Sequence, residues 1–187
     1  MGTTLDRLPP GPLTYEDYVE LPDDGKRYEV LGGELFVSPA PAPRHQMVSA
    51  NLEWQLALHV RRRRLGRILH APIDLILSPT TIAQPDVLFI RSGHESIVTG
   101  RAIEGAPDLV VEILSPSTGR KDRTTKALLY ARFRVAHYWI IDPDERTVEL
   151  YELDGEAYRL VSKEGGETIV RPSLFPGLEI DLGELWA

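Results

Sequence analysis

The pattern of apolar and polar positions along the chain predicts both helices and strands. Apolar residues recur every four positions over about Arg44–Leu65, which predicts a long amphipathic helix. A second helix is expected over about Asp122–Phe133, with Asp122 as its N-cap, and a short capped helix follows Thr14. Runs rich in β-branched residues predict strands near Ile68–Leu77, Pro85–Ile90, Leu109–Leu114 and His137–Asp142.

A β-hairpin is expected before this core and an antiparallel meander after it. Gly32 and Gly33 separate the two halves of Arg27–Val37 and suit a type I′ turn, whose central residues both need a positive φ. That register places Glu29 and Glu34 on one face. The meander is expected to comprise Thr147–Leu153, Tyr158–Lys163, Thr168–Arg171 and Leu178–Leu182. The fold class is therefore α+β, a mixed sheet with the core order α-β-β-β-α-β.

Length and composition narrow the class of protein. The 187 residues, 42% hydrophobic and 26% charged, suit one globular domain over 1–187, with a core at about 27–142 and an acidic β extension over about 143–187. No apolar run approaches the roughly 20 residues of a membrane helix, and the N-terminus has no signal-peptide core. Without cysteine there is no disulfide, thiol nucleophile or cysteine-ligated zinc, and a cytoplasmic location is expected.

The net charge of −7 is unevenly distributed. Residues 1–36 carry 3 basic and 8 acidic side chains, residues 37–141 carry 14 and 8, and residues 142–187 carry 4 and 12. A basic middle in an acidic protein suits a phosphate-binding site, although arginines that merely solvate a helix would give the same balance. The run Arg61–Arg64 is interpreted as such a solvated helix end.

Two carboxylates lie in strands that are otherwise apolar. Side chains alternate along a strand, so Glu112 faces one side of Leu109–Leu114 among apolar neighbours. Asp86 lies at the start of the strand Pro85–Ile90. If these strands pair antiparallel, the two acids approach each other and suit a divalent cation, whereas each acid alone is equally explained by a cap, a turn or an ion pair. Asp108 lies too far from Glu112 to share an ion and is read as a strand-entry residue.

Lys126 is the candidate cation for this acid pair. It shares the stripe of the second helix with Leu129, Tyr130 and Phe133, on the side expected to face the core. Because the helix directly follows the Glu112 strand, the amine could reach back over the carboxylates. The alternative is a lysine that snorkels to solvent.

These residues resemble the PD-(D/E)XK restriction-endonuclease-like superfamily. More narrowly, the chain resembles a bacterial family of "putative restriction endonucleases" formerly classed as a domain of unknown function. The matching segments, within about Tyr15–Leu153, are Arg27–Leu35, Pro43–Gln46, Gln84–Leu88, Ala106–Thr118, Lys126–Tyr130 and Tyr138–Pro143. The motif lysine of the superfamily should stand two residues after Glu112, where this chain has Leu114.

The resemblance implies a metal-dependent nuclease. Asp86 and Glu112 would hold Mg²⁺ or Mn²⁺, Lys126 would replace the missing motif lysine, and Glu34 would add a catalytic carboxylate. The residues expected to contact nucleic acid are Arg44, His45, Arg120, Lys121, Arg123 and Tyr130. A capping or surface histidine explains His45 equally well, and a solvated hairpin acid explains Glu34 better than a catalytic role does. DNA is the first candidate substrate, and a homodimer would suit cleavage of both strands of a duplex.

Two other functions stay open from the sequence. A nuclease-like fold that has lost catalysis could bind nucleic acid or protein, which Leu114 and the acidic C-terminal segment favour. An acidic protein that oligomerises through its meander is the third reading. The sequence does not distinguish DNA from RNA, internal from terminal cleavage, or any sequence preference.

Overall fold

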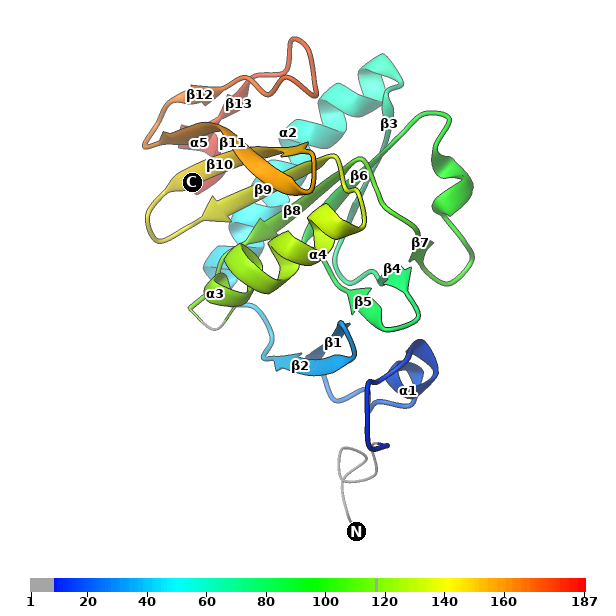
Figure 1. Cartoon of the computed structure of the whole chain (residues 1–187). Helices are drawn as coiled ribbons and strands as arrows, with labels where there is room; N and C mark the ends of the chain where they lie inside the picture. The colour runs from blue at the N-terminus through cyan, green and yellow to red at the C-terminus, as the bar shows by residue number, and fades with distance from the viewer. Residues whose placement is uncertain (1–8, 117) are drawn as a thin grey trace.

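A computed structural model describes residues 9–116 and 118–187, and its centre is a six-stranded sheet covered on both faces (Figure 1). The strand order is β11-β10-β9-β8-β6-β3. The strands are β3 (Gly66–His70), β6 (Val87–Arg91), β8 (Leu109–Ile113), β9 (His137–Asp142), β10 (Thr147–Asp154) and β11 (Ala157–Gly165). Within this sheet only β8 and β9 run parallel, because the helical crossover between them carries the chain back to the end of the sheet where β8 begins.

Helices pack on opposite faces of this sheet. On one side lies α2 (Pro43–Arg63), and on the other α4 (Ala127–Arg132). Along the chain, the helices and strands of this layered unit follow in the order α2, β3, β6, β8, α4 and β9. This confirms the predicted α+β class and the core order α-β-β-β-α-β. The side chains of β8 alternate as expected: Val111 packs in the cluster beneath α2, and Val110 packs in the cluster beneath α4.

A second, five-stranded sheet lies beside the first, in the order β2-β1-β5-β4-β7. Its strands are β1 (Arg27–Leu31), β2 (Glu34–Ser38), β4 (Leu75–Ser78), β5 (Thr81–Ala83) and β7 (Ile103–Glu104). The hairpin register is as predicted, with Leu31 opposite Glu34 and positive φ at both turn glycines. The single strand predicted over Ile68–Leu77 is wrong. Pro72 has no N–H to donate and interrupts it, so β3 and β4 join different sheets.

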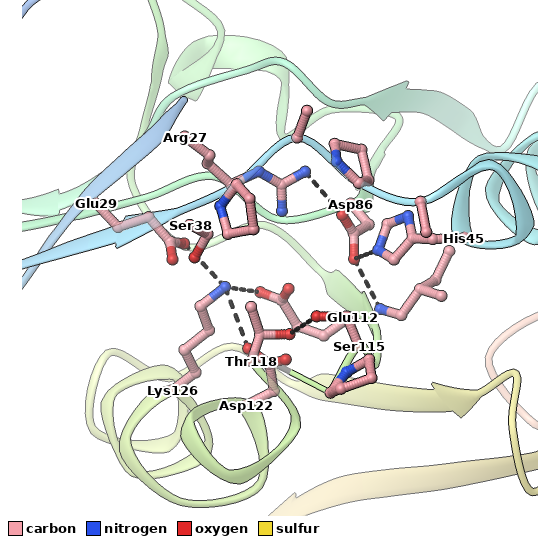
Figure 2. A pocket seen from close by; sticks show the side chains of 16 residues that line it. Arg27, Glu29, Ser38, His45, Asp86, Glu112, Ser115, Thr118, Asp122 and Lys126 are labelled. Carbon is pink, nitrogen blue, oxygen red and sulfur yellow. Dashed lines mark hydrogen bonds and ion pairs between the residues drawn. The ribbon is translucent and has the colours of Figure 1, made fainter. Parts of the chain in front are cut away.

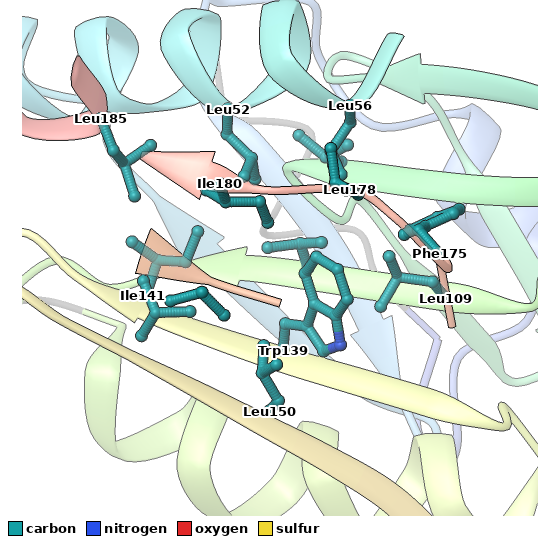
Figure 3. Packing of buried hydrophobic residues seen from close by; sticks show 14 of the residues in the cluster. Leu52, Leu56, Leu109, Trp139, Ile141, Leu150, Phe175, Leu178, Ile180 and Leu185 are labelled. Carbon is teal, nitrogen blue, oxygen red and sulfur yellow. The ribbon is translucent and has the colours of Figure 1, made fainter. Parts of the chain in front are cut away.

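The C-terminal segment leaves the meander after β11. It forms β12 (Ile169–Val170), β13 (Ile180–Asp181) and α5 (Leu182–Trp186), with β12 and β13 paired only with each other. The prediction that the last two strands continue the meander is therefore wrong, and α5 was not predicted. Apolar burial explains the path: Phe175 and Leu178 pack near Trp139 between the sheet and α2 (Figure 3).

The helix that precedes β9 has three parts. They are α3 (Gly119–Lys121), the π-helical turn η3 (Asp122–Lys126) and α4. Asp122 is thus an interior helical residue and not the predicted N-cap. The chain already turns before Gly119, because the carbonyl of Ser115 accepts hydrogen bonds from the N–H groups of Thr118 and Gly119. Ser117, part of the motif Ala106–Thr118, lies outside the described residues.

The remaining helices are short. The predicted helix after Thr14 is α1 (Tyr15–Val19), which begins with a capping box between Thr14 and Asp17. A 3₁₀ turn, η2 (Glu95–Ile97), leads toward β7. Within residues 9–116 and 118–187, no helix combines the length and apolar character that crossing a bilayer requires.

Candidate active site

The pairing of β6 with β8 brings Asp86 and Glu112 to one place. Val87 lies opposite Val111, so Asp86, one residue earlier, aligns with Glu112. Both side chains are buried, at 2% and 1% exposure, and both line a cavity of about 210 Å³ (Figure 2). The two acids therefore converge as predicted, because β6 and β8 pair antiparallel in this register.

Asp86 is held by donors from three directions. Its Oδ1 accepts a hydrogen bond from Arg27 Nη2 at 3.0 Å, and its Oδ2 accepts one from the Ile113 N–H at 2.7 Å. His45 Nε2 lies 3.2 Å from Oδ2. Burial alone would raise the pKa of Asp86, but His45 and Arg27 outweigh it and lower the pKa. Asp86 is therefore kept as a carboxylate.

Glu112 receives two donors on a single oxygen. Lys126 Nζ and the Tyr130 hydroxyl lie 2.9 and 2.7 Å from its Oε1. Burial raises the pKa of Glu112, Lys126 opposes this, and the nearby carboxylates of Asp122 and Asp86 raise it further. Glu112 therefore lies where negative charge is in excess.

Lys126 points into this group of acids, as Figure 2 shows. Its Nζ lies 2.8 Å from Glu29 Oε1, 2.9 Å from Glu112 Oε1 and 3.4 Å from Asp122 Oδ1. Burial alone would lower the pKa of Lys126, but these carboxylates outweigh it and raise the pKa well above its ordinary value. The side chain is thus a buried ammonium group at the acid pair, and not the snorkelling lysine of the alternative interpretation.

Glu34, expected in the site, lies outside it. Its side chain is exposed at the start of β2, beside the open turn, whereas Glu29 of β1 is 1% exposed and lines the cavity. The two acids share one hairpin face, and the expectation that Glu34 adds the catalytic carboxylate is wrong because its side chain lies outside the cavity. The missed signal was local: Glu29 stands between Tyr28 and Val30 in an apolar run, the same pattern that singled out Glu112.

The residues expected to bind nucleic acid are divided by the structure. His45 lies in the cavity wall and Arg120 is exposed beside it, lining an adjoining hollow. Lys121 Nζ is 2.7 Å from Glu29 Oε2, and Arg123 Nη1 is 2.6 Å from Glu149 Oε2. Both cations therefore already have acidic partners.

Two further expected contacts have other partners. Arg44 is half exposed and contacts Asp144 and the carbonyl of Pro143, away from the cavity lining. Tyr130 is 1% exposed, and its hydroxyl donates to Glu112. Tyr130 is therefore placed to hold a site carboxylate, and its burial contradicts the expected contact with nucleic acid.

The donor set fits a hard divalent cation that takes most of its ligands from elsewhere. Among the described residues, no three His, Cys, Asp or Glu side chains are arranged to hold a metal by themselves. A carboxylate has about four acceptor positions, and Asp86 uses three of them, so one remains for a cation. Mg²⁺ characteristically uses one or two carboxylates together with water and phosphate oxygens.

The charge balance and two buried polar atoms also fit an added ligand. The acids Glu29, Asp86, Glu112 and Asp122 outnumber the cations paired with them, Arg27, Lys121 and Lys126. Within the described part of the chain, His45 Nδ1 and Asp122 Oδ1 are buried without a hydrogen-bond partner. Such atoms normally bind water or a ligand.

The mixed sheet, the acid pair at the join of β6 and β8, and the lysine from the next helix define a restriction-endonuclease-like fold. The sequence model of the Uma2 family, described as "Putative restriction endonuclease", matches residues 15–183, and the chain belongs to this family. This confirms the resemblance seen in the sequence.

A solved structure shares the fold. It is described as a "putative nuclease belonging to DUF820 from Anabaena variabilis ATCC 29413" and is 22% identical in sequence, with a TM-score of 0.76. The match covers 94% of this chain and 98% of the other. No curated protein sequence matches the chain.

Proposed function

We propose that this protein is a divalent-metal-dependent nuclease that hydrolyses phosphodiester bonds of nucleic acid, with DNA as the first substrate to test. Family membership supports nuclease chemistry in general. The observation that carries the specific proposal is the alignment of Asp86 with Glu112, with the Lys126 ammonium 2.9 Å from Glu112.

In this proposal Asp86 and Glu112 would hold Mg²⁺ or Mn²⁺. The ion, when bound, supplies Lewis-acid polarisation of the scissile phosphate and activates the attacking water. Arg27 and the Ile113 N–H orient the Asp86 carboxylate through the hydrogen bonds already present. Tyr130 orients Glu112 in the same way.

Lys126 is an electrostatic stabiliser in this mechanism. An amine that remains an ammonium cannot accept the proton of the attacking water, so Lys126 is not the general base. The fixed positive charge of this buried amine instead stabilises the negative charge that builds on the phosphate oxygens. The amine is placed for this role because it lies beside Glu112 in the wall of the cavity.

Calorimetric titration with Mn²⁺ tests the metal site directly. Wild type is expected to bind the ion, and Asp86→Asn and Glu112→Gln are each expected to weaken binding by about tenfold or more. Glu34→Gln is the matched control, because Glu34 is exposed outside the cavity. Equal affinity in the two site variants and in wild type would refute the assignment of the metal ligands.

Cleavage of end-labelled single-stranded and duplex DNA and RNA then tests the reaction. Wild type with Mg²⁺ is expected to shorten at least one of these, chelator is expected to stop it, and Asp86→Asn is expected to be inactive. Product size distinguishes internal from terminal cleavage.

A second candidate function is a nuclease-like module that binds without cutting. It is favoured by one observation: the cavity cations Arg27 and Lys126 are both paired with acids, as is Lys121 beside them. It predicts salt-sensitive binding of nucleic acid that chelator leaves unchanged, with no product from any of the four substrates.

A further inference from the structure

Glu29 holds two lysines of the helix that follows β8. Its Oε2 lies 2.7 Å from Lys121 Nζ, and its Oε1 lies 2.8 Å from Lys126 Nζ. The Gln84 N–H also donates to Oε1 at 3.0 Å, and the whole side chain is 1% exposed. Burial alone would raise the pKa of Glu29, but the two lysines outweigh it and lower the pKa to about 2. Glu29 is therefore a buried anion with three donors, two of which are lysine amines.

The π-helical turn explains how both lysines reach one carboxylate. Lys121 and Lys126 are five residues apart, and an α-helix would place them about 140° apart around its axis. The turn η3 spans Asp122–Lys126, and a turn closed by i→i+5 bonds brings residues five apart to the same side. This irregularity of the helix lies where the two amines converge on Glu29.

Glu29 contacts a lysine that stands on the helix and not at the motif position on the strand. A motif lysine on the strand would share the rigid backbone of Glu112, but this chain has Leu114 there. Lys126 instead extends from a helix on a side chain with four rotatable bonds, whose amine has three donors to satisfy. Glu112 accepts from the amine and Asp122 lies within ion-pair distance on one side, and Glu29 reaches the amine from the other sheet (Figure 2).

We propose that Glu29 is a positioning residue of the active site: it fixes the Lys126 ammonium against Glu112 and retains Lys121 beside the cavity. The β1–β2 hairpin is then a functional part of the site and not only a neighbouring sheet. The effect on cleavage rests on the proposed nuclease function, whereas the effect on the two amines does not.

The variant that tests this is Glu29→Gln, which keeps the shape and removes the charge. Glu34→Gln is the matched control: the same change, in the same hairpin, at a residue outside the cavity. Glu29→Asp retains the charge but is one methylene shorter, so this variant is not expected to contact both lysines fully.

The first readout is the ammonium resonance of Lys126 in ¹H–¹⁵N NMR, without metal or substrate. A buried, fully paired ammonium exchanges its protons slowly, so wild type and Glu34→Gln are expected to show the resonance. It is assigned by its absence in Lys126→Met. In Glu29→Gln it is expected to shift and broaden or vanish, with Glu29→Asp intermediate. An unchanged resonance in Glu29→Gln would overturn the proposal.

The second readout separates positioning from metal binding. Glu29→Gln is expected to lower kcat by about 100-fold, with KM and the Mn²⁺ affinity changed by less than about threefold. Loss of Mn²⁺ binding equal to that of Asp86→Asn would overturn the positioning role and make Glu29 a metal ligand. If wild type cuts nothing, the nuclease function fails, but the resonance still decides the role of Glu29. If Glu29→Gln does not fold, the same measurements on Glu29→Asp decide it.

Discussion

The hydroxyl of Tyr130 lies 2.7 Å from Glu112 Oε1, the same oxygen that lies 2.9 Å from Lys126 Nζ. Tyr130 follows Lys126 by one helical turn, so both side chains leave the helix on the same side. The helix that crosses from β8 to β9 therefore returns two donors to the strand that precedes it. The crossover helix thus supplies both side-chain donors that contact Glu112 Oε1.

At pH 9, above the pKa of about 8 to which burial raises Glu112, Tyr130→Phe is expected to destabilise the protein by about 2 kcal/mol, because it removes a hydrogen bond to a buried carboxylate and leaves little void. Urea unfolding measures this. Tyr158→Phe is the matched control: its hydroxyl donates to the neutral carbonyl of Val135 at 2.8 Å, and a loss of about 1 kcal/mol is expected. Equal losses in the two variants would show that the charge of Glu112 contributes nothing to the Tyr130 bond.

Lys126→Met is expected to cost about 3–5 kcal/mol, because it leaves buried carboxylates without their common cation. The variant is also expected to lose cleavage activity. Differential scanning fluorimetry and urea unfolding measure the stability. Lys26→Met, at an exposed lysine paired with Asp24, is expected to change neither stability nor activity. A fully stable Lys126→Met would mean that the acids take up protons at no cost.

Adding Mn²⁺ to Lys126→Met extends this prediction. If Asp86 and Glu112 are metal ligands, a divalent cation offsets the uncompensated charge, so the melting temperature of the variant should rise more than that of wild type. An equal rise in melting temperature in both proteins would show that the metal does not bind at the carboxylates whose charge Lys126 balances.

Glu149 predicts a dependence of stability on pH. Burial alone would raise the pKa of Glu149, but Arg123, Lys163 and Tyr151 outweigh it and lower the pKa to about 2. In the unfolded chain the pKa is about 4.3, so the unfolded state binds the proton first as the pH falls. The stabilisation is therefore complete above about pH 5 and is lost as the pH falls toward about 2.

Urea unfolding of wild type and Glu149→Gln between pH 3 and pH 7 checks this. At pH 7 wild type is expected to be more stable than Glu149→Gln. This difference in the free energy of unfolding should shrink toward pH 3. Glu164→Gln, at an exposed acid on β11, serves as the control. A difference that is the same at both pH values would refute the prediction.

Gly66, the first residue of β3, lies at a close approach to the backbone of β6. Its φ is +152°, and a Cβ there would lie 2.0 Å from the carbonyl oxygen of Ile90. Gly66→Ala is expected to cost about 3 kcal/mol in urea unfolding, from backbone strain and overpacking together. Gly93→Ala also has a positive φ but meets no atom within 4 Å, so a cost of about 1 kcal/mol is expected. Similar costs would show that the clash at Gly66 is relieved by a shift of β6.

The core elements and the acid pair could be predicted from local patterns. The repeat of apolar residues identified α2 because one face of that helix is buried by the sheet. A single acid in an apolar strand identified Glu112, because a buried carboxylate needs a partner wherever the strand lies. Antiparallel pairing of the two strands is the condition for aligning Glu112 with Asp86, and the register of β6 and β8 satisfies it.

Other parts of the site needed the tertiary structure. The apolar neighbours of Glu29 mark it as a buried acid, but only the packing of the second sheet against the crossover helix brings it to Lys121 and Lys126. The residues expected to contact nucleic acid are a similar case: the partners of Lys121, Arg123 and Tyr130 come from β1, β10 and β8.

The sequence by itself determined which residues form the helices, the buried strands and the carboxylates that carry the family resemblance, because periodicity and burial act over a few neighbouring residues. The tertiary structure decided which acid meets which cation, since those contacts join segments far apart in the chain: Glu29 and Lys121 are separated by 92 residues. Charge pairing over such separations depends on how the two sheets and the crossover helix pack, and no local pattern in the chain specifies that.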